Sequence, residues 1–269
     1  MTSTTTRRSW LIGGSLYVVS VGPNSQSTQR EPELLGQTVV LIGGSAGIGL
    51  ETARRARTEG ANVVLTGRNP DRLKDAAAEV GAQHTAAFDA NDSDALHNFF
   101  EDLASPIDHV LVTAGGPRYV PLLEMDAADV REALSAHVVL GLEVARSARA
   151  KMPPGGSLTL MGGTGGRRID HRLGIVSAAT AVLPPFTAAL ALELAPIRVN
   201  LIAAGFVDTP VSASLLGDQL DNRRNELRTT LPIGRVVGPQ DVAALAIHLM
   251  ANTALTGATY DIDGGQQFV

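Results

Sequence analysis

The chain has 269 residues, of which 44% are hydrophobic and 18% charged, so it can bury a sizeable core and lacks the composition of disordered proteins. Its formal net charge of −5 argues against a general binder of nucleic acid or membrane surfaces, since both need a basic surface. Cysteine is absent, which excludes disulfides, zinc–thiolate sites, iron–sulfur clusters and a cysteine nucleophile. With six histidines, none spaced as a ligand pair, no metal site is expected.

The sequence predicts that residues 1–34 form an N-terminal extension. Residues 6–11 are Thr-Arg-Arg-Ser-Trp-Leu, an order similar to a twin-arginine export signal, and an apolar stretch follows them. Small residues at 13–15 dilute this stretch, and no small-x-small cleavage site follows it. We therefore expect a disordered extension or a mis-called start rather than an export leader, and one folded domain over 35–269. No segment is expected to be long enough to span a bilayer, which takes about 20 apolar residues.

From residue 38 onward, short apolar runs alternate with longer amphipathic ones. The short runs are rich in β-branched residues, as in parallel strands buried on both faces, and cover 38–42, 62–66, 85–88, 109–113, 158–161, 198–203 and 259–262. The longer runs predict helices over 48–59, 71–80, 92–103, 127–151, a stretch ending at 194, and 240–250. This alternation implies right-handed crossovers, so the predicted fold class is α/β: a single-domain, doubly wound parallel sheet of about seven strands flanked by helices.

Glycine and proline mark several of the predicted helix ends. Gly60 follows the first helix, Pro70 opens the second and Gly81 closes it. Pro184 and Pro185 fall inside the stretch that ends at residue 194. Because proline disfavours a helix interior by about 3 kcal/mol, we expect that helix to be bent there.

The first predicted strand leads through Gly43-Gly44-Ser45-Ala46-Gly47-Ile48-Gly49 directly into a helix. Glycines permit a tight turn with positive φ and let the backbone approach a pyrophosphate. The helix N-terminus offers free N–H groups and a positive dipole end to that anion. Within a strand–loop–helix unit, the pattern predicts a dinucleotide site where the strand order reverses, and the alternative is merely a tight turn.

The spacing of these glycines resembles that of the short-chain dehydrogenase/reductase family, whose fold is of the Rossmann type. Further matches are Asp89 after the third strand, Ala114-Gly115 after the fourth, Ile197-Arg198-Val199-Asn200, the segment 204–210 (Ala-Gly-Phe-Val-Asp-Thr-Pro), and Asp261-Ile262-Asp263-Gly264-Gly265. The resemblance implies that Asp89 lies near the adenine and that Val207 and Thr209 lie against the nicotinamide. The cofactor-binding residues it implies are Gly43, Gly47, Ile48, Gly49, Asp89, Ala114, Gly115, Val207 and Thr209.

The end of the second strand bears on which nicotinamide cofactor is bound. A site selective for NAD needs a carboxylate there for the ribose 2′-hydroxyl, whereas a 2′-phosphate needs a cation. Gly67 stands where that carboxylate is expected, and Arg68 follows it with a planar guanidinium suited to phosphate. Ser45 could add a hydroxyl contact. We therefore expect NADP(H), the alternative being that Arg68 is only a solvated charge.

The family's catalytic residues are a serine, a tyrosine and a lysine supported by an asparagine, and this chain departs from that pattern. The matching positions hold His137 for the asparagine, Gly163 for the serine, Val176 for the tyrosine and Thr180 for the lysine. No shifted alignment restores the pair, since none of the three tyrosines has a lysine four residues later. Loss of a positioned general acid typically costs about 10²–10⁴ in rate, so carbonyl reduction by the family's usual route is not expected.

Three residues are candidates for a replacement catalytic group. His137 is expected at the floor of the pocket, where its imidazole would titrate near neutrality, unless it is a core histidine that fills the asparagine's space. Asp170 lies in the charged segment 167–172, as a proton donor or a partner for a cationic substrate, unless that segment is a solvated loop. Thr164 offers a hydroxyl beside the position of the missing serine.

Two functions remain open at this point. One is an NADP-dependent oxidoreductase with an altered proton donor, acting on an unknown small molecule such as an iminium or an activated enone, whose reduction generates no hard alkoxide. The other is an NADP(H)-binding protein without hydride transfer: a sensor, a scaffold, or a non-redox cyclase or isomerase. The retained Val207 and Thr209 favour the first.

Partners and location follow from the resemblance and from the cofactor. A homodimer or homotetramer is expected, with no nucleic-acid, membrane or metal partner. Because NADPH is regenerated in the cytoplasm, a cytoplasmic location is expected.

Overall fold

The computed structural model describes residues 31–104, 106–117, 119–167, 169 and 173–269, together with the strands at 6–12 and 15–21. The chain divides into two units, Met1–Pro32 and Glu33–Val269. In the first unit, β1 (Thr6–Ile12) pairs antiparallel with β2 (Ser15–Val21). The disordered extension expected from the sequence thus contains two paired strands. Two β-prone runs separated by two glycines are a hairpin signal in the sequence itself.

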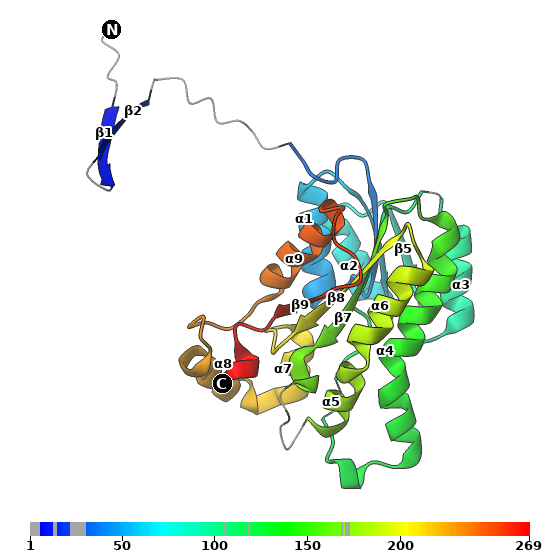
Figure 1. Ribbon diagram of the computed structural model, residues 1–269. Coiled ribbons are helices and arrows are strands. Elements are labelled where there is room, and N and C mark those ends of the chain that lie inside the picture. The colour runs from blue at the N-terminus through cyan, green and yellow to red at the C-terminus, as the bar shows by residue number, and fades with distance from the viewer. Residues whose placement is uncertain are drawn as a thin grey trace. The chain divides into compact units, whose positions relative to one another are not determined.

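The second unit is built on a parallel sheet of seven strands (Figure 1). The strands are β3 (Thr38–Ile42), β4 (Asn62–Gly67), β5 (His84–Ala87), β6 (His109–Val112), β7 (Ser157–Gly163), β8 (Arg198–Ala204) and β9 (Thr259–Ile262). Their order is β5-β4-β3-β6-β7-β8-β9, so the winding reverses between β3 and β6. The predicted α/β class and doubly wound sheet are confirmed.

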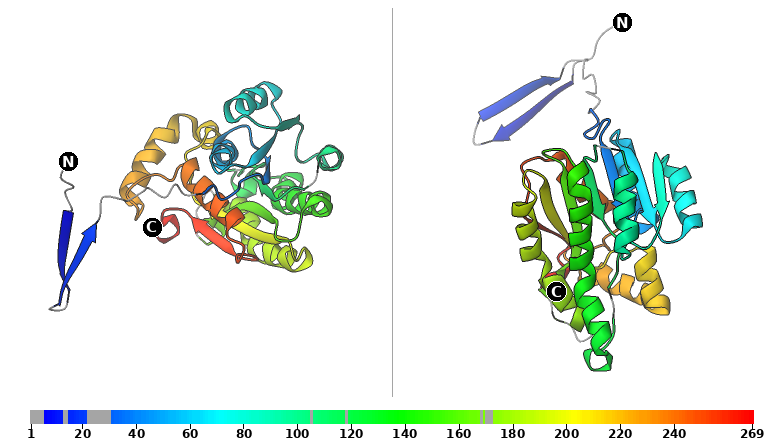
Figure 2. Two further views of the ribbon diagram at one scale, coloured as in Figure 1. Left: turned by 90° about the horizontal axis from the view of Figure 1, so that it is seen from above. Right: turned by 90° about the vertical axis from the view of Figure 1, so that its right-hand side faces the viewer.

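Helices cover both faces of this sheet (Figure 2). Side chains of α1 (Gly47–Thr58), α2 (Pro70–Val80) and α9 (Pro239–Ala251) form one hydrophobic core with the strands. Those of α3 (Ser93–Asp102), α4 (Ala127–Ala148) and α6 (Leu183–Glu193) form the other. The remaining helices are α5 (Gly174–Ala181), α7 (Pro210–Leu216) and α8 (Leu220–Thr230), with 3₁₀ turns at Leu122–Glu124, Arg149–Lys151, Thr164–Gly166, Gly217–Gln219 and Gln266–Phe268.

Most predicted boundaries agree with the structure to within one residue, and the differences have local causes. The strand predicted over 85–88 is β5, which begins and ends one residue earlier. It is an edge strand with little burial, so the apolar pattern of the sequence does not define its ends. The α-helix predicted over 127–151 ends at Ala148, and its last three residues form a 3₁₀ turn. Helices α7 and α8 were not predicted, because α7 is short and Leu227 is the one buried residue in α8.

The sequence predicts a bend at Pro184 and Pro185, and the structure instead divides the helix just before them. Helix α5 ends at Ala181, and α6 begins at Leu183 with prolines in its first turn, where the missing N–H groups cost little. Taken as one helix, Gly174–Glu193 has the length and apolar composition of a membrane span, contrary to the expectation that no segment would. Residues such as Leu183 and Leu190 are nevertheless buried in the domain core, which accounts for the apolar composition.

A buried histidine lies at the amino end of the central strand β6, whereas the glycine loop follows the carboxyl end of β3. His109 opens β6, and its Nδ1 lies 2.8 Å from the Ser157 hydroxyl while its Nε2 lies 2.6 Å from Gln37 Oε1. The amide oxygen can only accept, so Nε2 carries the proton and Nδ1 accepts from the serine. Burial, with the nearby positive charge of Arg198, lowers the pKa of His109 to about 3, so the imidazole stays neutral in the folded protein.

This neutral histidine should make stability fall in acid. Below pH 6.5, His109 binds a proton in the unfolded chain but stays neutral in the folded chain. The free energy of unfolding therefore falls by about 1.4 kcal/mol per pH unit as pH falls toward 3. Urea unfolding at pH 7 and at pH 5 measures this loss. Between the two pH values, the free energy of unfolding of His109→Gln should fall by about 2 kcal/mol less than that of the wild type. The exposed His248→Gln serves as control and should behave as wild type. An unchanged pH dependence in His109→Gln would contradict this assignment.

Candidate functional site

The glycine loop brings the N-terminus of α1 against the ends of β3 and β6. Gly43 and Gly47 have φ of +102° and +55°, in the region that favours glycine. A Cβ at Gly49 would overlap the Gly43 carbonyl oxygen and lie 2.7 Å from Thr113 Oγ1, and one at Gly43 would lie 2.7 Å from the Ala114 amide nitrogen. Three of the predicted glycines are therefore required by the backbone path, and the first N–H groups of α1 face the carboxyl edge of the sheet.

Thr113 connects this loop to the next strand, a role that sequence reasoning missed. Its hydroxyl donates to the Gly43 carbonyl oxygen at 3.0 Å, and its backbone N–H donates to the Ile42 carbonyl oxygen at 2.8 Å. Ala114, one of the predicted cofactor residues, donates its N–H to the same Ile42 oxygen. In the sequence, Thr113 is only a small polar residue at the end of a strand, and nothing there indicates that β6 approaches the glycine loop.

The segment predicted to face the nicotinamide lies next to the glycine loop. Thr209 is the N-cap of α7, and its hydroxyl accepts a hydrogen bond from the Ser212 backbone N–H. A Cβ at Gly47 would lie 3.5 Å from the Thr209 Cβ, so the two loops are in van der Waals reach. Val207 is buried and bridges to Val237. The structure thus brings the predicted pyrophosphate and nicotinamide segments together.

The end of β4 carries the residues from which NADP(H) rather than NAD is expected. A Cβ at Gly67 would lie 2.8 Å from Ser45 Oγ, which places the Ser45 hydroxyl at the position where a carboxylate would otherwise project. Arg68 is exposed and forms no ion pair with the described residues. Asp89, after β5, is exposed and accepts hydrogen bonds from the backbone and side chain of Asn91.

The positions that match the family's catalytic residues lie together at the end of β7. A Cβ at Gly163 would lie 3.3 Å from Thr180 Cγ2, and one at Gly165 would lie 3.7 Å from Val176 Cγ1. The Thr180 hydroxyl donates to the Val176 carbonyl oxygen at 2.8 Å, so it is engaged within its own helix. Thr164 is buried beside them. None of these side chains titrates in the range of a general acid.

His137 is the ionisable candidate that the structure places here. It projects from α4 toward the loop after β6, where a Cβ at Gly115 would lie 3.9 Å from its Nε2. Its Nδ1 is buried without a hydrogen-bond partner among the described residues, and burial lowers the pKa of the ring below 6.5. Asp170, the other ionisable candidate, lies outside the described residues.

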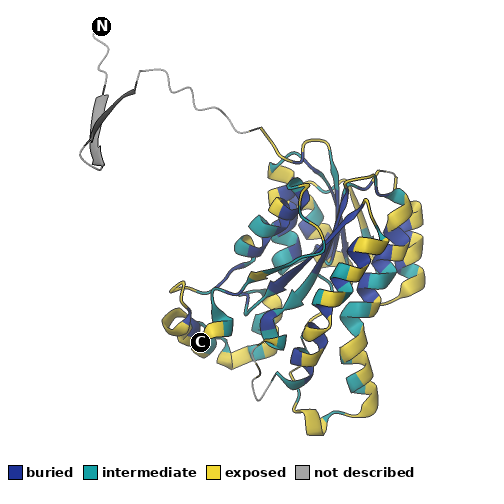
Figure 3. Cartoon of the chain, in the orientation of Figure 1, coloured by how far each residue is buried: buried dark blue, intermediate teal, exposed yellow. Residues whose placement is uncertain are grey.

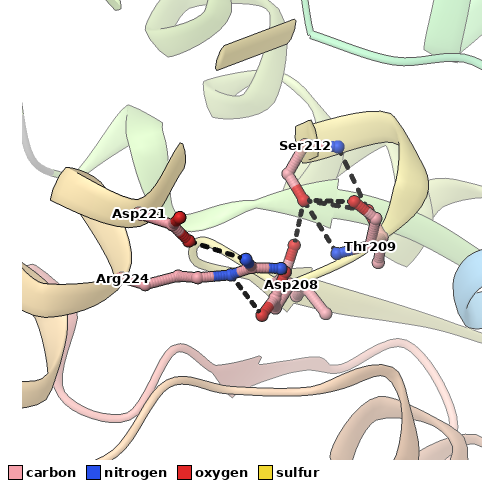
Figure 4. Close-up of polar contacts among 6 residues, drawn as sticks. Asp208, Thr209, Ser212, Asp221 and Arg224 are labelled. Atoms are coloured by element: carbon pink, nitrogen blue, oxygen red, sulfur yellow. Dashed lines mark hydrogen bonds and ion pairs between the residues drawn. The ribbon is translucent and has the colours of Figure 1, made fainter. Parts of the chain in front are cut away.

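A second feature that the sequence did not predict is a cluster of charged residues around Asp208, which precedes Thr209 (Figure 4). Arg224 on α8 donates from Nε and Nη2 to the two carboxylate oxygens of Asp208, each at 2.8 Å, and from Nη1 to Asp221 at 3.0 Å. These carboxylates raise the pKa of Arg224 further above its usual range. Because Asp208 stands between Val207 and Thr209, the pair ties α8 to the segment expected to face the nicotinamide.

Comparison with known proteins places this geometry in a family. Residues 43–267 match the family model for enoyl-(acyl carrier protein) reductase. The short-chain dehydrogenase/reductase ATR9 of Stachybotrys chlorohalonatus is 31% identical over 252 residues, which cover 87% of this chain and 98% of that protein. The chain belongs to the short-chain dehydrogenase/reductase family.

Solved structures of other short-chain dehydrogenase/reductases have the same fold. The MalC reductase/Diels-Alderase from Malbranchea aurantiaca superposes with a TM-score of 0.83 and 25% identity, over 89% of this chain and 99% of that chain. BdcA, solved in complex with NADPH, superposes with a TM-score of 0.77 and 29% identity, over 87% of this chain and 95% of that chain. The expected family and Rossmann-type fold are confirmed.

Substitution of Gly49 tests the close contact at the start of α1. Gly49→Ala should reduce dinucleotide affinity at least tenfold and lower the free energy of unfolding by about 1–3 kcal/mol, because the added methyl group forces α1 away from β3. Calorimetric titration and urea unfolding measure the two effects. Gly116→Ala is the matched control, since its nearest neighbour would lie 3.9 Å away. Equal behaviour of the two variants would contradict the role of Gly49.

Substitution of Arg224 tests the connection between α8 and the nicotinamide segment. In Arg224→Met, amide hydrogen exchange over 207–230 should accelerate at least tenfold, because both bonds to Asp208 are lost. Arg223→Met is the control, since Arg223 pairs with Glu226 on the same helix, and its exchange should stay within twofold of wild type. Unchanged exchange in Arg224→Met would show that α8 is held by other contacts.

Proposed function

We propose that this short-chain dehydrogenase/reductase is an NADP(H)-dependent oxidoreductase that reduces a small organic substrate without the family's tyrosine and lysine. The observation that carries the proposal is that the glycine loop 43–49 lies close to both Thr113 and Thr209, beside a β4 end that has Ser45 and Arg68 and no carboxylate. The NADPH complex of a relative with the same fold supports it.

The residues present fit a dinucleotide that carries a 2′-phosphate. Backbone N–H groups at the start of α1 would hold the pyrophosphate, because side chains are excluded there by the glycines. Ser45 and Arg68 would hold the 2′-phosphate through a hydroxyl and a guanidinium. Asp89, Ala114 and Gly115 would line the adenosine side, and Val207 and Thr209 the nicotinamide. When bound, NADPH supplies a hydride to the substrate carbon.

The side chains at the substrate end favour a substrate that needs little proton donation. Gly163, Val176 and Thr180 supply no general acid, and burial keeps His137 mostly neutral at pH 7. An iminium carbon accepts a hydride while its C=N π electrons return to nitrogen, so a neutral amine forms without a proton. An activated enone instead forms an enolate, whose protonation His137, Thr164 or Asp170 would assist. A ketone forms a hard alkoxide, for which the described site holds no strong donor.

We expect the protein to act in the cytoplasm, where NADPH is regenerated, and to form a homodimer or homotetramer. Both expectations rest on the cofactor and on the family resemblance.

Two five-membered-ring substrates, each with one methyl group, test the proposed chemistry. The protein should oxidise NADPH with 2-methyl-1-pyrroline, which is protonated to an iminium, at least about a hundredfold faster than with 2-methylcyclopentanone. The ketone lacks the positive nitrogen, so its reduction needs an acid, which the described residues of the site do not provide. NADPH binding without oxidation by either compound would favour the alternative of a cofactor-binding protein without hydride transfer.

Substitution of Arg68 tests the choice of cofactor. Arg68→Ala should weaken NADPH binding about tenfold or more, which is about 1.4 kcal/mol, because the 2′-phosphate loses its cation. NADH affinity should stay within twofold, since NADH lacks that phosphate. Arg72→Ala, on an exposed position of α2, is the control. Equal losses for NADPH and NADH would contradict the role of Arg68.

The lowered pKa of His137 predicts the direction of a pH effect. If the imidazolium donates the proton, reduction of an activated enone should rise about tenfold per unit as pH falls from 7 toward the pKa of His137, which lies below 6.5. His137→Gln should remove this rise and cost about a hundredfold at pH 5, with NADPH affinity unchanged. A pH profile that survives in His137→Gln would exclude His137 as the donor.

A further inference from the structure

The last residues of the chain form a compact turn after β9. Asp263 is 5% exposed, and its two carboxylate oxygens accept hydrogen bonds from the backbone N–H groups of Gly265 at 2.8 Å and Gln267 at 3.0 Å. A Cβ at Gly265 would lie 2.6 Å from Pro232 Cγ, so the turn also packs closely on the segment after α8. These contacts fix the backbone of the 3₁₀ turn Gln266–Phe268, at the partly exposed end of the chain (Figure 3).

The side chain of Gln266 reaches from this turn to the segment that precedes Val207. Its Oε1 accepts a hydrogen bond from the Phe206 backbone N–H at 2.8 Å. A Cβ at Gly205 would lie 2.7 Å from Gln266 Oε1 and 2.7 Å from Asp263 Cβ, so the close approach of this side chain requires glycine there. The C-terminal turn is therefore in direct contact with the backbone that leads to Val207.

The same segment is fixed independently at its later end. The Asp208 N–H donates to the Val237 carbonyl oxygen at 3.0 Å, a bond in which the C-terminal turn takes no part. Because Phe206 directly precedes Val207, its bond to Gln266 sets the orientation of the peptide group that leads into the residues expected to face the nicotinamide. Loss of this bond would free the first half of the segment while the second half stays in place.

We propose that Gln266 is a positioning residue for the nicotinamide, acting through the Phe206 backbone so that Val207 and Thr209 meet the ring. The inference rests on the proposed function, to which the nicotinamide contacts of these two residues belong. It differs from a purely structural role in one measurable respect. Loss of the Gln266 acceptor should weaken binding of the nicotinamide and leave the rest of the dinucleotide, which the glycine loop and Arg68 would hold, unaffected.

Calorimetric titration of the full-length chain with two matched ligands tests the proposal. NADPH and 2′-phospho-ADP-ribose share every part except the nicotinamide ring. Gln266→Met keeps the length of the side chain and removes its acceptor oxygen, so NADPH binding should weaken about tenfold, with 2′-phospho-ADP-ribose within twofold of wild type. Gln267→Met is the matched control, because Gln267 donates to Asp261, which keeps its ion pair with Arg167. Both affinities of that control should stay within twofold.

Amide hydrogen exchange of the protein without cofactor gives a second readout. The Phe206 amide should exchange at least about tenfold faster in Gln266→Met than in the wild type or in Gln267→Met, because it has lost its acceptor. The Asp208 amide, whose acceptor is unchanged, should stay within twofold in all three proteins.

Three outcomes would overturn the inference alone. Equal weakening of both ligands in Gln266→Met would show that the side chain supports the site as a whole, and unchanged binding of both would show that the nicotinamide does not depend on it. Unchanged exchange of the Phe206 amide would show that other contacts hold this backbone. If the wild type bound neither ligand, the proposed function would be rejected and this inference with it.

Discussion

The functional geometry depends on one close contact, the approach of the α1 N-terminus to the ends of β3 and β6. Gly49 lies so near the Gly43 carbonyl oxygen and the Thr113 hydroxyl that no side chain fits between them. This contact fixes where α1 begins and turns its free N–H groups toward the point at which the strand order reverses. Thr209, in the segment expected to face the nicotinamide, lies close to this loop, because a Cβ at Gly47 would be 3.5 Å from the Thr209 Cβ.

At the end of β7, the proposed function departs from the catalysis that the family resemblance implies. Gly163 and Thr180 are close enough to have held a serine and a lysine, and the space between them is instead neutral and small. A dinucleotide site with no strong acid among the described residues would suit the proposed chemistry, in which the substrate carries its own positive charge.

Sequence reasoning predicted the elements that burial and turn chemistry define. The buried strand β3 and the edge strand β9 match residue for residue, and Asn69 and Gly81 bound α2 through a side-chain cap and a left-handed glycine. Helix α8 could not be predicted, since its stability comes from Leu227 and from the bonds of Arg224 to Asp208, which are long-range in sequence. In the site, glycines mark the loop clearly, whereas Thr113 acquires its role only when β6 pairs with β3.

Binding of a dinucleotide with a 2′-phosphate beside the glycine loop can be measured by calorimetric titration of the wild-type chain with NADPH and then with NADH. The account predicts micromolar NADPH binding and at least tenfold weaker NADH binding, a difference of about 1.4 kcal/mol. Absence of binding by either cofactor would mean that the glycine loop serves only the packing of α1. Tighter binding of NADH would contradict the assignment of Ser45 and Arg68 to the phosphate.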